Sequence, residues 1–281
     1  MMLKIENLTF GYNHRRQVIR NFNMEVAPGT ICGLLGKNGS GKSTLLYLIC
    51  GLLRPQGGSV DFNGFTPIQR KVGFLEDVFI VPEEFSLPSV KLADFVKVNA
   101  PFYPRFSQRE MNDYLLTFDL DPETHLGQCS MGQKKKAFIS FALACNTSLL
   151  ILDEPTNGLD ISAKRAFRKA VTMNMNDDKS IIISTHQVYD IERILDHVMI
   201  IDNQGVLLNE SMYDISKRLR FGVTSDRDRI ARALMAFDAP GGASIVELAD
   251  DPDGETDVNL EMLFEFVEQN RDKVKEIFNE K

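Results

Sequence analysis

A glycine-rich stretch near the N-terminus has the residue types and spacing of a phosphate-binding loop. Residues 36–43 read GKNGSGKS, which matches the pattern GxxxxGK[ST] between a predicted strand and a predicted helix. Glycines let backbone N–H groups curl around phosphates, and the helix adds the positive end of its dipole. A ligand-free glycine-rich turn is the alternative. The residues expected to bind nucleotide are Gly36, Asn38, Gly39, Ser40, Gly41, Lys42, Ser43 and Thr44. Among them, Lys42 reaches the β- and γ-oxygens and the Ser43 hydroxyl ligates Mg²⁺.

Two carboxylates end a short apolar stretch in the middle of the chain. Residues 149–152 are all Leu or Ile, and Asp153 and Glu154 come directly after them. At the end of a buried strand, Asp153 is placed to hold Mg²⁺ and Glu154 to polarise an attacking water. A strand that simply leaves the core would look the same, so the two carboxylates gain their meaning from residues 155–160.

The segment after Glu154 carries a resemblance to a known family. Residues 153–160 read DEPTNGLD, which resembles the segment of ATP-binding-cassette (ABC) ATPases that joins the catalytic acid to an aspartate at the dimer contact. The resemblance implies that Glu154 is catalytic and that Asp160 contacts a second subunit.

A second segment is similar to the signature of the same family. Residues 129–133 read CSMGQ, against LSGGQ in the family, and they precede a predicted long helix. The resemblance implies that Ser130, Gly132 and Gln133 reach a nucleotide held by the other subunit. Met131 stands where the family has glycine and would resist a positive φ. Capping of the helix by a polar residue is compatible with this role, because a helix N-terminus also binds anions.

Two further residues take their expected roles from the resemblance. His186 comes after the predicted strand 181–183 and is similar to the family's switch histidine, which contacts the γ-phosphate. Tyr12 resembles the aromatic residue that stacks on adenine. A histidine in an ordinary loop and an aromatic residue in the core are the alternatives.

Glu76 is the most informative departure from the family pattern. It occupies the position at which the resemblance implies a glutamine that reaches Mg²⁺ and the water. A carboxylate keeps an oxygen ligand but adds negative charge, so we expect Glu76 to favour metal binding and to repel nucleotide when the metal is absent. The alternative is a solvated acidic loop in which the glutamine's role has lapsed.

The elements that must position these residues are predicted by hydrophobic periodicity. Alternating apolar residues predict antiparallel strands over 3–10 and 22–26, and apolar runs predict strands over 30–35, 149–152 and 181–183. Residues 198–202 and 206–208 are typical of a closing hairpin. The fold class is therefore α/β: a P-loop NTPase with a mixed central sheet, an N-terminal antiparallel β subdomain, a helical insertion and a small C-terminal α+β extension.

We expect a nucleotide-binding domain over 1–220 and an extension of unknown role over 221–281. The helical insertion is expected over about 77–146, with Ser107 as a helix cap. Within the extension, Asp250 to Gly254 is predicted to form a loop and residues 260–278 to form helices.

Composition excludes several classes of protein. The net charge is −7 and the pI is about 5.3, which argues against a general nucleic-acid binder, and we interpret residues 134–136, all Lys, as a solvated helix turn. The four cysteines have no disulfide or zinc-ligand spacing. There is no signal-peptide pattern or apolar stretch of spanning length, so we expect a cytoplasmic protein that reaches the inner face of the membrane through a partner.

The resemblance implies an ATPase that uses Mg²⁺ with ATP and works as a nucleotide-sandwich dimer, with a second copy of itself or a related cassette. The signature separates it from GTPases and P-loop kinases. The favoured function is to power a separate transmembrane permease, of export type by analogy. Two alternatives remain: an ABC ATPase acting on a macromolecular assembly, and a low-turnover nucleotide sensor.

Overall fold

A six-stranded mixed sheet runs through the centre of the molecule, in the order β5-β6-β7-β3-β8-β9. Only β8 and β9 pair antiparallel; the other neighbours in this sheet are parallel. Every residue of β3, β6 and β7 is buried, as expected of apolar parallel strands covered on both faces. The strands are β3 (Ile31–Leu35), β5 (Val78–Val81), β6 (Leu149–Asp153), β7 (Ser180–Thr185), β8 (His197–Asp202) and β9 (Gly205–Ser211). The carboxyl ends of β3, β6 and β7 therefore meet at one edge, where the candidate residues lie.

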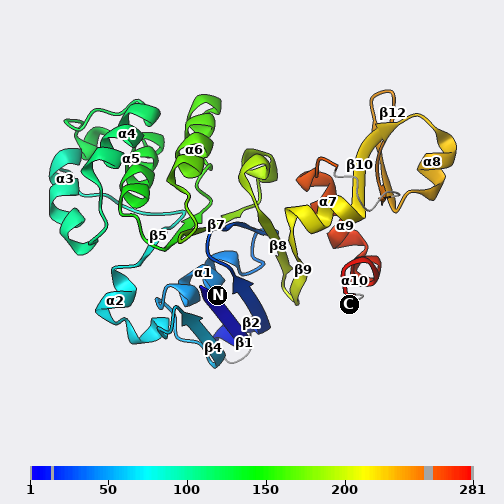
Figure 1. Ribbon diagram of the computed structural model, residues 1–281, viewed down its shortest axis with the longest axis horizontal. Helices are drawn as coiled ribbons and strands as arrows, with labels where there is room; N and C mark the ends of the chain where they lie inside the picture. Colours follow the sequence, from blue (N-terminus) through cyan, green and yellow to red (C-terminus); the bar gives the residue numbers. More distant parts are fainter. Residues whose placement is uncertain (1, 14–15, 250–255, 280–281) are drawn as a thin grey trace.

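The computed structural model describes residues 2–13, 16–249 and 256–279, and its parts are arranged along one long axis (Figure 1). The helical part lies at one end of this axis and the C-terminal extension at the other. In the described part of the chain, no helix combines the length and the apolar character needed to cross a bilayer.

The N-terminal antiparallel sheet packs against one face of the central sheet. It has the order β2-β1-β4, with β1 (Leu3–Asn13), β2 (Arg16–Val26) and β4 (Gly57–Phe62). Its inward side chains, helix α1 (Lys42–Ile49) and residues of β3, β6, β7 and β8 form a single apolar core. The predicted antiparallel subdomain is confirmed. The apolar core that it shares with α1 fixes the position of this helix, which begins directly after the phosphate-loop residues.

The helical part covers the other side of the β5-β6 edge. Its helices are α3 (Leu92–Asn99), α4 (Gln108–Phe118) and α5 (Met131–Ala144), and α6 (Ile161–Asn174) packs against α4 and α5. The Ser107 hydroxyl caps α4 by accepting a hydrogen bond from the Glu110 N–H at 3.2 Å. The prediction of helices from residue 77 is wrong at its start, because β5 adds a strand to the central sheet.

Short helical segments connect the larger elements. The short helix α2 (Val72–Leu75) precedes β5, and 3₁₀ turns lie at Pro67–Gln69, Ala100–Phe102, Leu126–Gln128, Val188–Asp190 and Glu192–Ile194.

The C-terminal extension contains a second antiparallel sheet, in the order β10-β12-β11. The predicted boundary at residue 220 falls inside β10 (Leu219–Thr224), which follows α7 (Met212–Arg218). The elements that come after β10 are α8 (Arg227–Arg232), β11 (Met235–Ala239), β12 (Gly242–Leu248), α9 (Leu260–Gln269) and α10 (Arg271–Asn279). The predicted α+β character and terminal helices are confirmed, while the predicted loop over Asp250 to Gly254 lies outside the described residues. Leu263 and Phe266 of α9 share one core with Ile191 and Leu195, which come after β7. The extension is therefore packed onto the segment beyond His186.

Candidate active site

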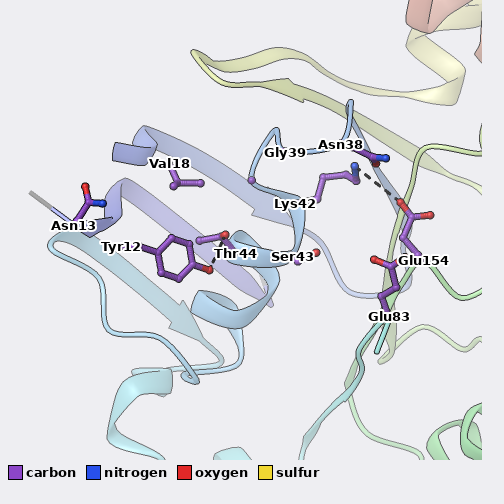
Figure 2. A pocket seen from close by; sticks show the side chains of 11 residues that line it. Tyr12, Asn13, Val18, Asn38, Gly39, Lys42, Ser43, Thr44, Glu83 and Glu154 are labelled. Carbon is purple, nitrogen blue, oxygen red and sulfur yellow. Dashed lines mark hydrogen bonds and ion pairs between the residues drawn. The ribbon is translucent and has the colours of Figure 1, made fainter. Parts of the chain in front are cut away.

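The loop between β3 and α1 borders a cavity of about 530 Å³, which we call the phosphate-loop cavity (Figure 2). Loop residues, two glutamates and residues of the N-terminal sheet contribute to its walls. The lining residues are Tyr12, Asn13, Val18, Asn38, Gly39, Gly41, Lys42, Ser43, Thr44, Glu83 and Glu154. Most of the predicted nucleotide-binding residues thus lie around one cavity; Gly36 and Ser40 belong to the same loop but are not part of its lining.

Local backbone geometry explains the glycines of this loop. Gly41 has a φ of +101° and precedes α1 without a side-chain cap, so it leaves the first N–H groups of the helix available to a ligand. At Gly36, a Cβ would lie 2.6 Å from both the Ile201 carbonyl oxygen and the Ser40 Oγ. Larger residues at these two positions would distort the loop.

The Lys42 ammonium lies inside the curl of the loop. Its Nζ donates hydrogen bonds to the carbonyls of Gly36 at 2.7 Å and Lys37 at 3.3 Å, and lies 4.0 Å from Glu154 Oε1. Burial lowers the pKa of Lys42, an effect opposed by Glu154 and other carboxylates of the site. A buried cation held by neutral carbonyls is well placed to exchange these contacts for those of a phosphate.

Asp153 presents a carboxylate oxygen that fits a cation. The Ser184 hydroxyl donates to its Oδ1, whereas Oδ2 is buried and has no hydrogen-bond partner within the described residues. Buried polar atoms are normally paired, and oxygen ligands suit Mg²⁺. Asp153, together with the Ser43 hydroxyl at the start of α1, therefore provides suitable ligands for the metal.

Glu154 and His186 contact each other directly, although they lie 32 residues apart. His186 Nδ1 is 2.8 Å from Glu154 Oε1, and the Thr185 hydroxyl donates to Oε2 at 3.1 Å. The Glu154 backbone has a φ of +47°, which is uncommon for a residue with a side chain. This conformation directs the carboxylate toward Lys42 as the chain leaves β6, and Figure 2 shows the two side chains facing each other.

The structure does not fit the prediction that Glu76 ligates Mg²⁺. Glu76 ends α2 before β5 begins, and Val78 at the start of β5 pairs with Leu149 at the start of β6. Glu76 is therefore near the opposite end of these strands from Asp153, and it lines a different cavity.

Glu83 lies where Glu76 was expected. It comes after β5, lines the phosphate-loop cavity with Lys42 and Glu154, and its Oε1 accepts a hydrogen bond from Asn157 Nδ2 at 3.1 Å. The available signal was the short apolar run 78–81, which precedes acidic residues as the run 149–152 does. Periodicity alone cannot distinguish a four-residue buried strand from helix, so this signal was missed.

Exchange of Glu83 for Gln is expected to raise the Mg²⁺ concentration that half-saturates ATPase activity by about three- to tenfold, because the metal would lose a charged oxygen ligand. Mg²⁺ titrations of steady-state hydrolysis measure this shift. Glu76→Gln is the matched control and should leave the titration within about twofold of the parent. Equal shifts in the two variants would contradict the placement of Glu83.

The signature residues lie at the exposed start of α5. The Ser130 hydroxyl accepts from the Gln133 N–H at 3.2 Å and Gln133 Oε1 accepts from the Ser130 N–H at 3.0 Å, so the two residues form a capping box. Met131 is helical and 56% exposed, so replacing glycine costs no strained φ. Gly132 lies beside the Gly158 carbonyl. None of these residues lines the phosphate-loop cavity of its own chain.

Asp160 and Tyr12 are both held by local contacts. Asp160 caps α6 by accepting from the Ala163 N–H at 2.8 Å, and this hydrogen bond lowers the pKa of the Asp160 carboxyl. The Tyr12 hydroxyl lies 3.1 Å from Thr44 Oγ1, and 63% of the residue is exposed. Its ring therefore offers an accessible aromatic surface at the mouth of the cavity.

The chain is similar in sequence to known proteins. The model of the family described as "ABC transporter" matches residues 19–157. The bacitracin transport ATP-binding protein BcrA of Bacillus licheniformis is 32% identical over 221 residues, covering 77% of this chain and 72% of BcrA. The zinc uptake system ATP-binding protein ZurA of Listeria monocytogenes is 28% identical, and the match covers 76% of this chain and 87% of ZurA.

Solved structures share the fold. A structure described as the ATP-binding subunit of an ABC transporter has a TM-score of 0.69 and 26% identity, covering 77% of this chain and 92% of its own. The dimeric, post-hydrolysis cassette MJ0796 bound to ADP and Pi has a TM-score of 0.64 at 22% identity, and the match covers 75% of this chain and 98% of the MJ0796 chain.

Proposed function

Because the chain belongs to the ABC transporter family and is an ABC-type ATPase, we propose that it is the subunit that powers a separate membrane permease. The joint placement of the phosphate loop, Asp153, Glu154 and His186 at one edge of the central sheet supports the ATPase part of this proposal, and an exposed apolar groove supports the permease part. Local contacts account for how each residue would act.

ATP binding is assigned to the phosphate loop and its surroundings. Lys42 and the N–H groups at the start of α1 hold the phosphates, and Tyr12 stacks on the base. Ser43, Asp153 and Glu83 would hold Mg²⁺, which would neutralise phosphate charge. The ammonium of Lys42 already lies among the carbonyls of the loop, so little rearrangement is needed to receive an anion.

Hydrolysis is assigned to Glu154 and His186. Glu154 Oε1, 4.0 Å from Lys42 Nζ, faces the position of the terminal phosphate and can orient and polarise a water. His186 holds that carboxylate through Nδ1 at 2.8 Å and then contacts the γ-phosphate.

A second subunit completes the site in this proposal. Ser130, Gly132, Gln133 and Asp160 lie at exposed helix starts, where backbone N–H groups can bind an anion, and none of them lines the phosphate-loop cavity of its own chain. An ATP-dependent dimer, of two copies or of this chain with a related cassette, would bring each signature to the partner's nucleotide.

The permease is proposed to dock in an apolar groove that contains Glu76. This groove has a volume of about 500 Å³ and lies between the β5 edge and the helical part. Its rim includes exposed side chains of Leu52, Val72 and Phe102, the last 67% exposed. Clustered apolar side chains at a surface are typical of protein interfaces. A short apolar segment on the inner face of a membrane protein fits this groove, and would place the ATPase at the cytoplasmic side of the membrane.

Co-purification from detergent-solubilised membranes tests this proposal. We expect the parent chain to retain a multi-span protein, and Phe102→Asp to lose most of it while keeping ATPase activity. Leu116→Asp, at an exposed apolar residue of α4 outside the groove, is the control and should retain the partner. Recovery of ribosomal or nucleic-acid partners instead would support action on a macromolecular assembly. An absence of ATP turnover would support a nucleotide sensor.

We propose export as the direction of transport, on the similarity of the short signature and the extension to those of export ATPases. The relatives include both bacitracin transport and zinc uptake proteins. Transport assays in inverted vesicles with the co-purified permease would decide the direction.

A further inference from the structure

Lys135 is a buried charged residue in the first turns of α5. The interpretation of the three adjacent lysines as a solvated turn is wrong for this residue, which is only 6% exposed. Lys136 is also engaged, since its Nζ donates to the Phe118 carbonyl of α4 at 3.0 Å. Burial of an unpaired ammonium costs free energy, so the hydrogen bonds of Lys135 indicate its role.

The Lys135 ammonium bonds to the turn that carries the catalytic carboxylate. Its Nζ donates to the Glu154 carbonyl at 3.1 Å and to the Asn157 carbonyl at 3.0 Å. The Asn157 N–H in turn donates to the Glu154 carbonyl at 3.2 Å. One cation therefore draws together both ends of the turn in which Glu154 adopts its positive φ.

The electrostatic surroundings of Lys135 point to the same role. Burial lowers its pKa, whereas Glu83, Glu154 and Asp153 raise it. These three carboxylates lie close together at the carboxyl edge of the sheet. The Lys135 ammonium therefore offsets part of the repulsion between them.

We propose that Lys135 is a positioning residue for ATP hydrolysis, which fixes the turn that aims the Glu154 carboxylate and ties that turn to the signature helix. Lys135 lies two residues after Gln133 on the same helix. A shift of the signature helix against a partner's nucleotide would therefore move the catalytic turn of its own subunit, linking the two sites of a dimer. The inference rests on the proposed role of Glu154.

Methionine at position 135 keeps most of the side-chain length and removes the charge. Lys135→Met is expected to lower kcat by at least about 30-fold, since small displacements of a catalytic group cost up to 10²-fold, with KM for ATP within about twofold. Lys136→Met is the matched control: it removes a neighbouring lysine–carbonyl contact away from the site, and kcat should stay within about threefold.

Two readouts separate positioning from general support of the fold. In single-turnover experiments, Lys135→Met should have little further effect in a Glu154→Gln background, because groups that act as a unit are non-additive. In Lys135→Ala, added methylammonium should restore part of kcat, and this variant also serves if the methionine variant does not fold.

The proposal is overturned if folded Lys135→Met keeps kcat within threefold of the parent, if Lys136→Met loses as much, or if methylammonium restores nothing to Lys135→Ala. A parent protein that binds but does not turn over ATP, or a Glu154→Gln variant with full activity, would instead remove the proposed function on which the inference rests.

Discussion

Glu154→Gln is expected to lower steady-state ATP hydrolysis by about 10²- to 10⁴-fold, because the amide cannot act as a general base. Gln retains the size of Glu and can still hydrogen-bond His186 and Thr185, so the cavity should keep its shape. ATP binding is expected to persist. Since hydrolysis would release the two subunits, the variant should accumulate as an ATP-bound dimer.

Size-exclusion chromatography with light scattering in saturating Mg-ATP measures this accumulation. The parent protein with ADP is the control and should elute as a monomer. A variant that remains monomeric in Mg-ATP would count against the nucleotide-sandwich dimer, and one that hydrolyses ATP at the parent rate would count against Glu154 as the base.

Lys42→Met is expected to weaken ATP binding by about 30- to 100-fold, the loss expected when a charge-assisted hydrogen bond to phosphate is removed. The substitution also leaves the Gly36 carbonyl without the donor that it has at 2.7 Å. Isothermal titration with ATP in the presence of a chelator separates binding from hydrolysis.

The control for Lys42 is another lysine with an ion pair. Lys91 pairs with Glu123 at 2.7 Å on the surface of the helical part, and Lys91→Met should leave the affinity unchanged. Retention of parental ATP affinity in Lys42→Met would sink the assignment of the phosphate loop.

The phosphate loop could be predicted from sequence because its chemistry is local. Eight consecutive residues specify the turn, the helix start and the lysine, and no distant contact is needed to recognise them. The strand ending at Asp153 could be predicted for a similar reason, because the recognisable segment DEPTNGLD follows its apolar run directly. The conclusions about ATP therefore depended little on tertiary structure.

Glu83 and Lys135 could not be assigned in the same way. The role of Glu83 depends on β5 pairing with β6 across about 70 intervening residues. A four-residue apolar run does not show with which strand it will pair. Lys135 looks like part of a charged surface until the chain beyond Glu154 folds back over α5. Both residues acquire their roles from contacts that only the assembled fold provides.

Helix α9 connects the C-terminal extension to the phosphate loop and to the segment after His186. Besides sharing a core with the segment after His186, α9 carries Glu268, whose Oε2 lies 2.6 Å from Nζ of Lys37 in the phosphate loop. A ligand that holds this loop and the histidine segment in place also favours the docked form of α9, by mass action. ATP binding is therefore expected to stabilise the packing of the C-terminal extension, although none of the described residues of this extension lines the phosphate-loop cavity.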